Sequence, residues 1–256
     1  MVWSTQSYYK IANLLIQWIG SLIFICVSYT SFAQSKPNKY GLQITQNAKE
    51  LLQQTAADSN MQMVALTQLI PQLTLDLKYS TTDNFIKQRL YPRGLQETYL
   101  RLPAASALQK VQAALKPMGL ALKIWDAYRP YSVTEKMWEP VKDDRYAANP
   151  ATGSGHNRGI AVDLTLISLH SGKELDMGTS FDHFSDTAHS NFDKLPTEVL
   201  KNRKLLKTLM EQHGFKVLDT EWWHFYLPES KKFPLMNLSF RQMKQYYRQI
   251  KKKQRP

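Results

Sequence analysis

The sequence predicts an α+β domain with a mainly antiparallel sheet and helices packed on it. Some segments have the apolar character or the apolar–polar alternation of strands, and others place apolar residues at helical spacing. Strands and helices follow one another along the chain with long connections between them, which favours an α+β arrangement. A hydrophobic content of 43% supports a globular core.

Strands are predicted at residues 73–79, 120–128, 160–166 and 221–227. The first of these alternates apolar and polar side chains, which is typical of a strand with one buried face. The third is almost wholly apolar, which is typical of a buried strand. A carboxylate in the middle of that apolar run therefore needs an explanation.

Helices are predicted over residues 103–116 and 197–212, with a shorter helical stretch over 132–141. Pro103 suits the first turn of the first helix, and Gly214 lies just past the end of the longer one. Residues 143–158 and 176–195 are predicted to be loops. A loop as long as the second one is usually functional or disordered in a compact domain.

The domain is expected to span residues 61–240. Residues 34–60 are polar and predict a linker with a short helix over 46–56. Residues 241–256 contain seven basic residues and no acid. We interpret them as a solvated basic C-terminal tail, and weak contact with an anionic wall or membrane surface is the alternative.

Residues 1–33 are predicted to be a secretory signal peptide. The chain carries no charge between Lys10 and Lys36, and residues 11–33 are mostly apolar. This run ends with Ser31 and Ala33, small residues at the positions that a signal peptidase recognises. Because the run could also span a bilayer, an uncleaved membrane anchor is the alternative. The protein is therefore expected to be secreted, in the periplasm, or membrane-anchored if the leader is kept.

The charge and the cysteine content narrow the classes of partner and the sources of stability. A net charge of +12 favours anionic partners, but no basic–aromatic pattern indicates nucleic acid, which we exclude as a partner. Cys26 is the single cysteine and lies in the leader. A cleaved chain therefore has no disulfide, and its stability must come from its core, helped by a metal if it binds one.

The segment "GSGHNRGIAVDLTL", residues 153–166, places Asp163 inside an apolar strand. An ionised carboxylate is costly there unless a cation or hydrogen bonds compensate it. His156 precedes it by seven residues, in a glycine-rich loop that lets the imidazole fold back toward the strand. A metal is one possible partner of Asp163, and a nearby arginine or backbone amides are the alternative. Ser154 could bind a ligand or substrate, or act in the turn.

The segment "EWWH" supplies Glu221 and His224 from the far end of the chain. If His224 lies on the strand, Glu221 belongs at its start or in the preceding turn. Two imidazoles and one carboxylate form a three-ligand zinc site with an open fourth position, and a further carboxylate can take a proton from water there. These types and roles fit peptide hydrolysis. A core histidine held between tryptophans is the alternative for His224.

Arg129 lies in "IWDAYRP", directly after a predicted strand. Its fixed charge and rigid donor fork suit the stabilisation of an oxyanion. An ordinary surface ion pair with Asp126 is the alternative.

These motifs together resemble those of the zinc D-alanyl-D-alanine dipeptidases, which are relatives of the D,D-carboxypeptidases. "SGHNRGIAVD" resembles the family pattern Ser-x-His-x-x-Gly-x-Ala-x-Asp, and "EWWH" resembles its Glu-x-x-His. "WDAYRP" resembles Trp-Asp-Gly-Tyr-Arg-Pro, with Ala127 in place of the glycine. "MGTSFD" and "LKYSTTDNF" resemble two further family segments. The resemblance covers residues 70–230.

The resemblance implies roles for the residues that match. One zinc ion per chain would be bound by His156, Asp163 and His224. Glu221 would be the catalytic base, and Arg129 would stabilise the oxyanion of the tetrahedral intermediate.

The resemblance also implies a substrate, the dipeptide D-alanyl-D-alanine, in cell-wall turnover or glycopeptide resistance. Asp182 would bind the free ammonium of that dipeptide, with Ser154 as a second substrate contact. The charge of a free amine would stabilise a buried anion there, whereas the neutral amide of a polymer could not offset the cost of desolvating that anion. A D,D-carboxypeptidase trimming peptidoglycan stems and a non-catalytic wall-binding protein are the alternatives. The presence of Glu221 argues against the latter, because a binding protein has no need of a base.

Overall fold

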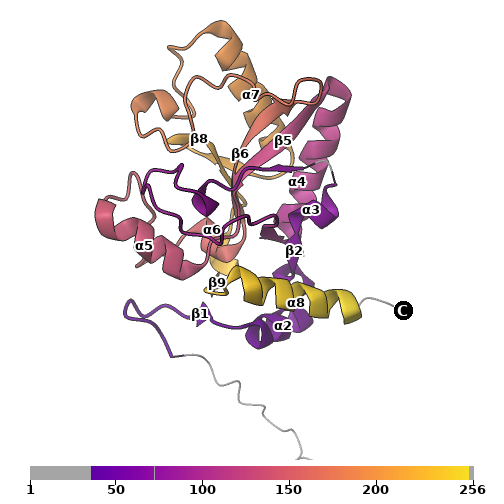
Figure 1. The fold of residues 1–256 in the computed structure, drawn as a ribbon, viewed down its shortest axis with the longest axis vertical. Helices are drawn as coiled ribbons and strands as arrows, with labels where there is room; N and C mark the ends of the chain where they lie inside the picture. The colour runs from indigo at the N-terminus through magenta and orange to yellow at the C-terminus, as the bar shows by residue number, and fades with distance from the viewer. Residues whose placement is uncertain (1–35, 72, 254–256) are drawn as a thin grey trace, which may run out of the picture. The chain divides into compact units, whose positions relative to one another are not determined.

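A five-stranded sheet lies at the centre of the computed structural model, which describes residues 36–71 and 73–253 (Figure 1). Its strands, in spatial order, are β3 (Thr74–Leu75), β5 (Leu120–Asp126), β6 (Ala161–Ser168), β8 (Glu221–Tyr226) and β7 (Lys216–Leu218). β3 pairs with β5 in parallel, and the other neighbours pair in antiparallel fashion. β6 is therefore an inner strand, with β5 on one side and β8 on the other.

The α+β class is confirmed, but the sheet is mixed rather than mainly antiparallel. A second parallel pair joins β1 (Ile44–Thr45) to β9 (Leu235–Met236). The physical reason for the difference is that residue alternation identifies a strand without giving its direction. Parallel neighbours need a long crossover, and α4 (Leu102–Leu115) lies in the connection between β3 and β5.

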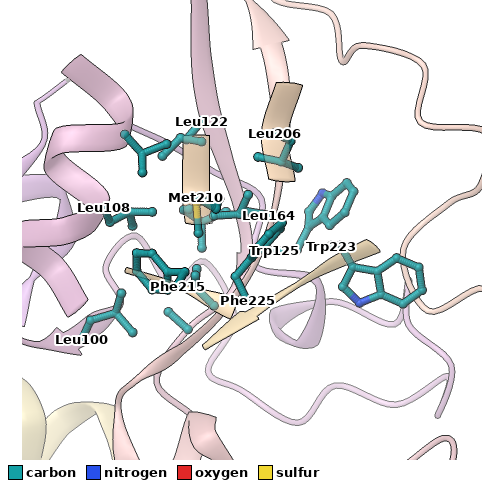
Figure 2. Packing of buried hydrophobic residues seen from close by; sticks show 14 of the residues in the cluster. Leu100, Leu108, Leu122, Trp125, Leu164, Leu206, Met210, Phe215, Trp223 and Phe225 are labelled. Atoms are coloured by element: carbon teal, nitrogen blue, oxygen red, sulfur yellow. The ribbon is translucent and has the colours of Figure 1, made fainter. Parts of the chain in front are cut away.

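Two long helices supply much of the main core, which Figure 2 shows in part. They are α4 and α7 (Thr197–Gln212), whose bounds match the predicted helices closely. Their buried residues include Leu108 and Met210, which belong to the same cluster as Leu122, Leu164 and Phe225 of the sheet. Alternation along β6 then turns Asp163 to the opposite face from Leu164.

The remaining elements frame this core. β2 (Met63–Ala65) pairs in antiparallel fashion with β4 (Tyr99–Arg101), which leads directly into α4. The other short helices are α3 (Leu66–Leu69), α5 (Tyr131–Val141) and α6 (Gly155–Arg158). α5 matches the predicted helical stretch, and α6 is a single turn inside the predicted loop 143–158. It leads into β6.

The terminal segments of the described chain form helices that pack against each other (Figure 1). α2 (Ala48–Ala57) contacts α8 (Phe240–Lys253). The interpretation of residues 241–256 as a solvated tail is thus wrong for residues 241–253. The many charges of α8 concealed a helical apolar spacing, since its buried residues are Phe240, Met243, Tyr246 and Ile250. Likewise, the predicted linker carries α2, with Leu51 fully buried.

The predicted signal peptide, residues 1–33, lies outside the described residues, so its cleavage and the export of the chain stay predictions. Within residues 36–71 and 73–253, no helix combines the length and the apolar character needed to cross a bilayer.

The packing of α8 predicts that Tyr246→Phe destabilises the protein. The Tyr246 hydroxyl lies 2.8 Å from Thr55 Oγ1 and accepts the Met63 backbone N–H at 3.2 Å, and both Tyr246 and Met63 are buried. Its removal leaves a buried donor unpaired, which should lower the free energy of unfolding by about 1–3 kcal/mol in urea titration. Tyr247→Phe, on the half-buried side of the same helix, is the control. Equal effects of the two changes would show that α8 is not docked in this way.

Candidate active site

The one-turn helix α6 brings His156 back toward the sheet. Ser154 is its N-cap and accepts the backbone N–H of His156, and Asn157 completes a capping box with Ser154. Gly159 ends the turn in the left-handed region at φ 72°, a conformation that glycine adopts without strain. The loop therefore reverses within a few residues, which places an imidazole beside the strand that follows it.

The orientation of His156 is fixed by a backbone carbonyl. His156 Nδ1 lies 2.7 Å from the carbonyl oxygen of Ala127, and the side chain is buried. Because a carbonyl only accepts, Nδ1 donates this hydrogen bond. Nε2 then faces the side chains of Asp163 and His224, 3.3 and 3.2 Å away. A hydrogen bond such as the one from Nδ1 to the Ala127 carbonyl is the kind that orients a metal-ligating histidine.

Asp163 and His224 meet across the sheet. They are partners in the register of β6 and β8, with Asp163 Oδ1 2.9 Å from His224 Nδ1. One ligand atom each from His156, Asp163 and His224 lies within 4.8 Å of the others. The convergence of His156 and Asp163, which the sequence left open, is thus present in the structure.

The separations of these atoms fit one tetrahedral ion. Zinc lies about 2.0–2.1 Å from nitrogen or carboxylate ligands, which puts ligand atoms roughly 3.3 Å apart at tetrahedral angles. His156 Nε2 lies 3.2 Å from His224 Nδ1 and 3.3 Å from Asp163 Oδ2, and His224 Nδ1 lies 2.9 Å from Asp163 Oδ1. A cation at this point would offset the cost of burying the carboxylate. The donor set therefore suits a metal ion.

Asp163 and the His224 imidazole beside it shift each other's pKa. Burial by itself raises the pKa of Asp163, but the His156 and His224 imidazoles beside it hold that pKa well below its usual range. Burial lowers the pKa of His224, and the adjacent Asp163 carboxylate more than reverses this and raises it. Asp163 is consequently ionised, and a metal ion that bound here would have to displace the proton that Asp163 favours on His224.

Glu221 lies at the start of β8, one of the two places that the sequence allowed. Its Oε2 is 3.9 Å from His224 Nδ1, and its side chain is 18% exposed. The register of β7 and β8 shifts between Val217 and Leu218, opposite this residue. A break in strand register changes the direction in which nearby side chains point. Glu221 and His224 are three residues apart, so a regular strand would place them on opposite faces, and this break lets them approach each other. Burial raises the pKa of Glu221 to about 7, and the Asp163 carboxylate adds to the rise.

Arg129 forms the ion pair with Asp126 that the sequence offered as an alternative, but the pair is buried. Arg129 Nε and Nη2 donate to Asp126 Oδ2 at 3.0 and 2.8 Å, and the two side chains are 9% and 0% exposed. Nη2 lies 4.0 Å from Asp163 Oδ2. The guanidinium carbon is 5.2 Å from the centre of the Tyr79 ring. Arg129 is therefore held rigidly beside the cluster.

Asp182 lies near this group, in the long predicted loop. Its backbone is in the left-handed region at φ 57°, and Tyr79 Oη donates to its carboxyl oxygens at 3.2 and 3.3 Å. Burial raises its pKa well above the usual range, and Asp163 and Glu221 raise it further. The preceding residues 174–180 line a cavity of about 430 Å³ together with Trp125, Thr165 and Trp222.

Ser154 has the turn role that the sequence gave as its alternative. Its hydroxyl accepts a backbone N–H as the cap of α6, and the residue is 8% exposed. Contact between Ser154 and a substrate stays a prediction.

The sequence missed the residues that support the site. Asp126 appeared only as a surface partner of Arg129, yet it is fully buried and also accepts from Tyr91 Oη at 2.7 Å. Tyr79, at the end of the first predicted strand, contacts both Arg129 and Asp182. The signal available for Asp126 was an aspartate within a largely apolar predicted strand, three residues before an arginine. The two tyrosines come from distant segments and gave no local signal.

Two imidazoles and a buried carboxylate beside a carboxyl group of near-neutral pKa define the site of a hydrolytic metalloenzyme. The sequence pattern of the Peptidase_M15 family, described as D-ala-D-ala dipeptidase, matches residues 59–250. The chain belongs to this family of peptidases.

Several known proteins are similar to the chain. The D-alanyl-D-alanine dipeptidase of Escherichia coli is 36% identical over 175 residues, which cover 68% of this chain and 89% of that relative. The D-alanyl-D-alanine dipeptidase of Enterococcus faecalis is 29% identical over 180 residues, covering 63% and 89%. Among solved structures, the LdcB LD-carboxypeptidase has a TM-score of 0.39 at 20% identity, covering 66% of this chain and 71% of its own.

The Asp126–Arg129 pair predicts that Asp126→Asn destabilises the protein. The change leaves a buried guanidinium without its main counter-charge, which should lower the free energy of unfolding by about 3–5 kcal/mol. Asp143→Asn removes the acid from a surface ion pair with Arg145 and serves as the control, with no measurable loss expected. Urea unfolding measures both. Similar losses in the two variants would mean that Asp126 is not a buried counter-ion.

Proposed function

We propose that the protein is a zinc-dependent dipeptidase that hydrolyses D-alanyl-D-alanine. One observation carries the proposal: His156, Asp163 and His224 converge on a point beside Glu221, in a chain that belongs to the Peptidase_M15 family. The named relatives are D-alanyl-D-alanine dipeptidases, which supports the choice of substrate.

The proposed metal complement is one zinc ion per chain, held by His156, Asp163 and His224. Two imidazoles and one carboxylate leave the fourth position of a tetrahedral ion open. When bound there, zinc supplies Lewis acidity for the scissile carbonyl and for water. The role of the chain is to hold these ligands in place, with Ala127 fixing the ring of His156.

Glu221 is proposed to move the proton. Its position beside His224 lets its carboxylate accept a proton from the attacking water. A pKa of about 7 means that the same group can return the proton to the leaving amine at neutral pH. The nitrogen of the scissile amide leaves as a neutral amine only after it has gained this proton.

Arg129 is proposed to stabilise the oxyanion. Nε and Nη2 are held by Asp126, and Nη2 also lies 4.0 Å from Asp163 Oδ2, beside the cluster. The remaining donors belong to a guanidinium whose position is already fixed. A donor that needs no reorganisation during the reaction is what an oxyanion site requires.

Asp182 is proposed to bind the substrate ammonium, with Tyr79 holding its carboxyl group. Burying this carboxyl group is costly, and a cation placed next to it offsets the cost. A dipeptide brings such a cation, but an amide-linked stem peptide does not. This difference favours a dipeptidase over a D,D-carboxypeptidase.

The proposed chemistry predicts that Glu221→Gln strongly slows hydrolysis of D-alanyl-D-alanine without loss of zinc. Removing a general base should lower kcat by about 10²–10⁴-fold. Zinc content is measured alongside activity, and a chelator should inactivate the wild type until zinc is restored. Glu139→Gln, at an exposed residue of α5, is the control. Normal turnover by Glu221→Gln, or a wild type that binds no metal, would disprove the mechanism.

The proposed role of Asp182 predicts a substrate-dependent effect of Asp182→Asn. A charged hydrogen bond is worth about 1.5–3 kcal/mol, so kcat/KM for D-alanyl-D-alanine should fall roughly 10–150-fold. The N-acetylated dipeptide, which lacks the ammonium, should be a poor substrate whose kcat/KM changes little. Asp193→Asn, exposed in the same loop, is the control.

Equal losses on both substrates would give Asp182 a structural role only. A wild type that prefers the acylated peptide would replace the dipeptidase proposal with a carboxypeptidase.

A further inference from the structure

The helix α8 presents a row of cations on its exposed side. Its buried residues anchor it in the domain, and the residues opposite them are Arg241, Lys244, Arg248, Lys251 and Lys252, which we call the basic face. Their spacing of three and four residues places them along one side of the helix. The helix contains six basic residues and no acid, which is half of the chain's net charge of +12.

The helix α7 of the same protein shows what an ordinary surface helix looks like. α7 mixes both signs, and its Lys201 and Lys207 form ion pairs with Glu198 and Glu211 at 3.5 and 3.9 Å. In the described part of the chain, no residue of the basic face forms an ion pair. A helix that only has to be solvated does not need basic residues without any acidic ones among them.

The positions of these cations also work against the helix itself. Cations suit the C-terminal turn of a helix, where the dipole is negative, which accounts for Lys251 and Lys252. Arg241 lies in the first turn and Lys244 directly after it, at the positive end of the dipole. Lys244 and Arg248 are four residues apart, as are Arg248 and Lys252, and like charges at this spacing repel. A fixed external anion would relieve both effects.

Acids of neighbouring elements are already engaged by the protein. On α2, which packs against α8, Glu50 accepts the backbone N–H of Gln46 and a hydrogen bond from Asn47. Glu97, in the segment before β4, is bound by the hydroxyl and the backbone N–H of Thr67. The basic face therefore stays open to an external partner.

We propose that the basic face of α8 docks the protein on an anionic phospholipid bilayer. A bilayer offers a plane of phosphate groups, which suits a row of cations on one side of a rigid helix. The apolar side of α8 is buried in the domain, so the contact is electrostatic and involves no insertion. The apolar run of residues 11–33 would bring the chain to a membrane whether it is cleaved or kept.

Nucleic acid fits this surface less well. Single-stranded binders interleave exposed aromatic rings with their cations. Tyr247 lies beside the basic face, with Lys251 Nζ 5.7 Å from its ring centre, but it is half-buried and packs against Tyr99 with the ring centres 6.2 Å apart. The proposal is also independent of the hydrolytic function, because α8 contributes no residue to the site.

The experiment compares the binding of the full chain to vesicles of mixed phosphatidylglycerol and phosphatidylcholine with binding to pure phosphatidylcholine. Any contribution of the leader is common to both vesicles and to all variants. The wild type should prefer the anionic vesicles in co-sedimentation. This preference should vanish between about 0.1 M and about 1 M salt, as the screening length falls from ~10 Å to ~3 Å.

The diagnostic variant is Arg241→Gln/Lys244→Gln/Arg248→Gln. Each cation near an anionic bilayer gives about a fivefold gain in partitioning, so the triple change should weaken anionic binding on the order of 100-fold. Lys201→Gln/Lys204→Gln/Lys207→Gln on α7 removes the same charge and is the matched control, with binding expected to stay within about twofold of the wild type. Circular dichroism checks that both variants fold.

Equal losses in the two triple variants would overturn the proposal in favour of net charge alone. So would a wild type without any preference for anionic vesicles. A third arm uses duplex DNA and inorganic polyphosphate as probes. Binding to either of these, lost in the α8 variant and without vesicle binding, would replace the bilayer with a soluble polyanion.

Discussion

Asp163 is a buried carboxylate on an inner strand of the sheet, and its charge has to be compensated inside the protein. Each element next to β6 contributes to this compensation. The turn α6 supplies His156, the strand β8 supplies His224, and the segment after β5 supplies Arg129. The order of the strands is therefore tied to the chemistry of the site, because β6 has to lie between the two strands that carry its partners.

Irregular strand pairing then sets the finer geometry. The register shifts between Ile124 and Asp126 on one side of the site, and between Val217 and Leu218 on the other. Regular strands would alternate their side chains strictly, and neither Asp126 nor Glu221 could be placed by alternation alone. The sheet thus fixes Asp163 and His224, while the two irregularities bring up Asp126, which holds Arg129, and Glu221, the proposed base.

The sequence predicted the parts of the site that have local signatures. His156 and Asp163 share one motif, and Glu221 and His224 share another, so residue types and spacing made them candidates, and the family resemblance then assigned their roles. Asp126 was misplaced at the surface, because burial is a property of the whole fold. The parallel pairing of β3 and the docking of α8 were missed for a related reason, because both depend on partners far away in the chain. The many charges of α8 led to its interpretation as a solvated tail, although its four buried side chains determine where it packs.

The pairing of β1 with β9 has a consequence for the order of folding. β1 is the first strand of the described chain, and its partner lies about 190 residues later, at Leu235 and Met236. Contacts of such long sequence separation form late, because the intervening chain must be ordered first. The domain cannot close until nearly all of it has been synthesised, and the two ends are then secured together.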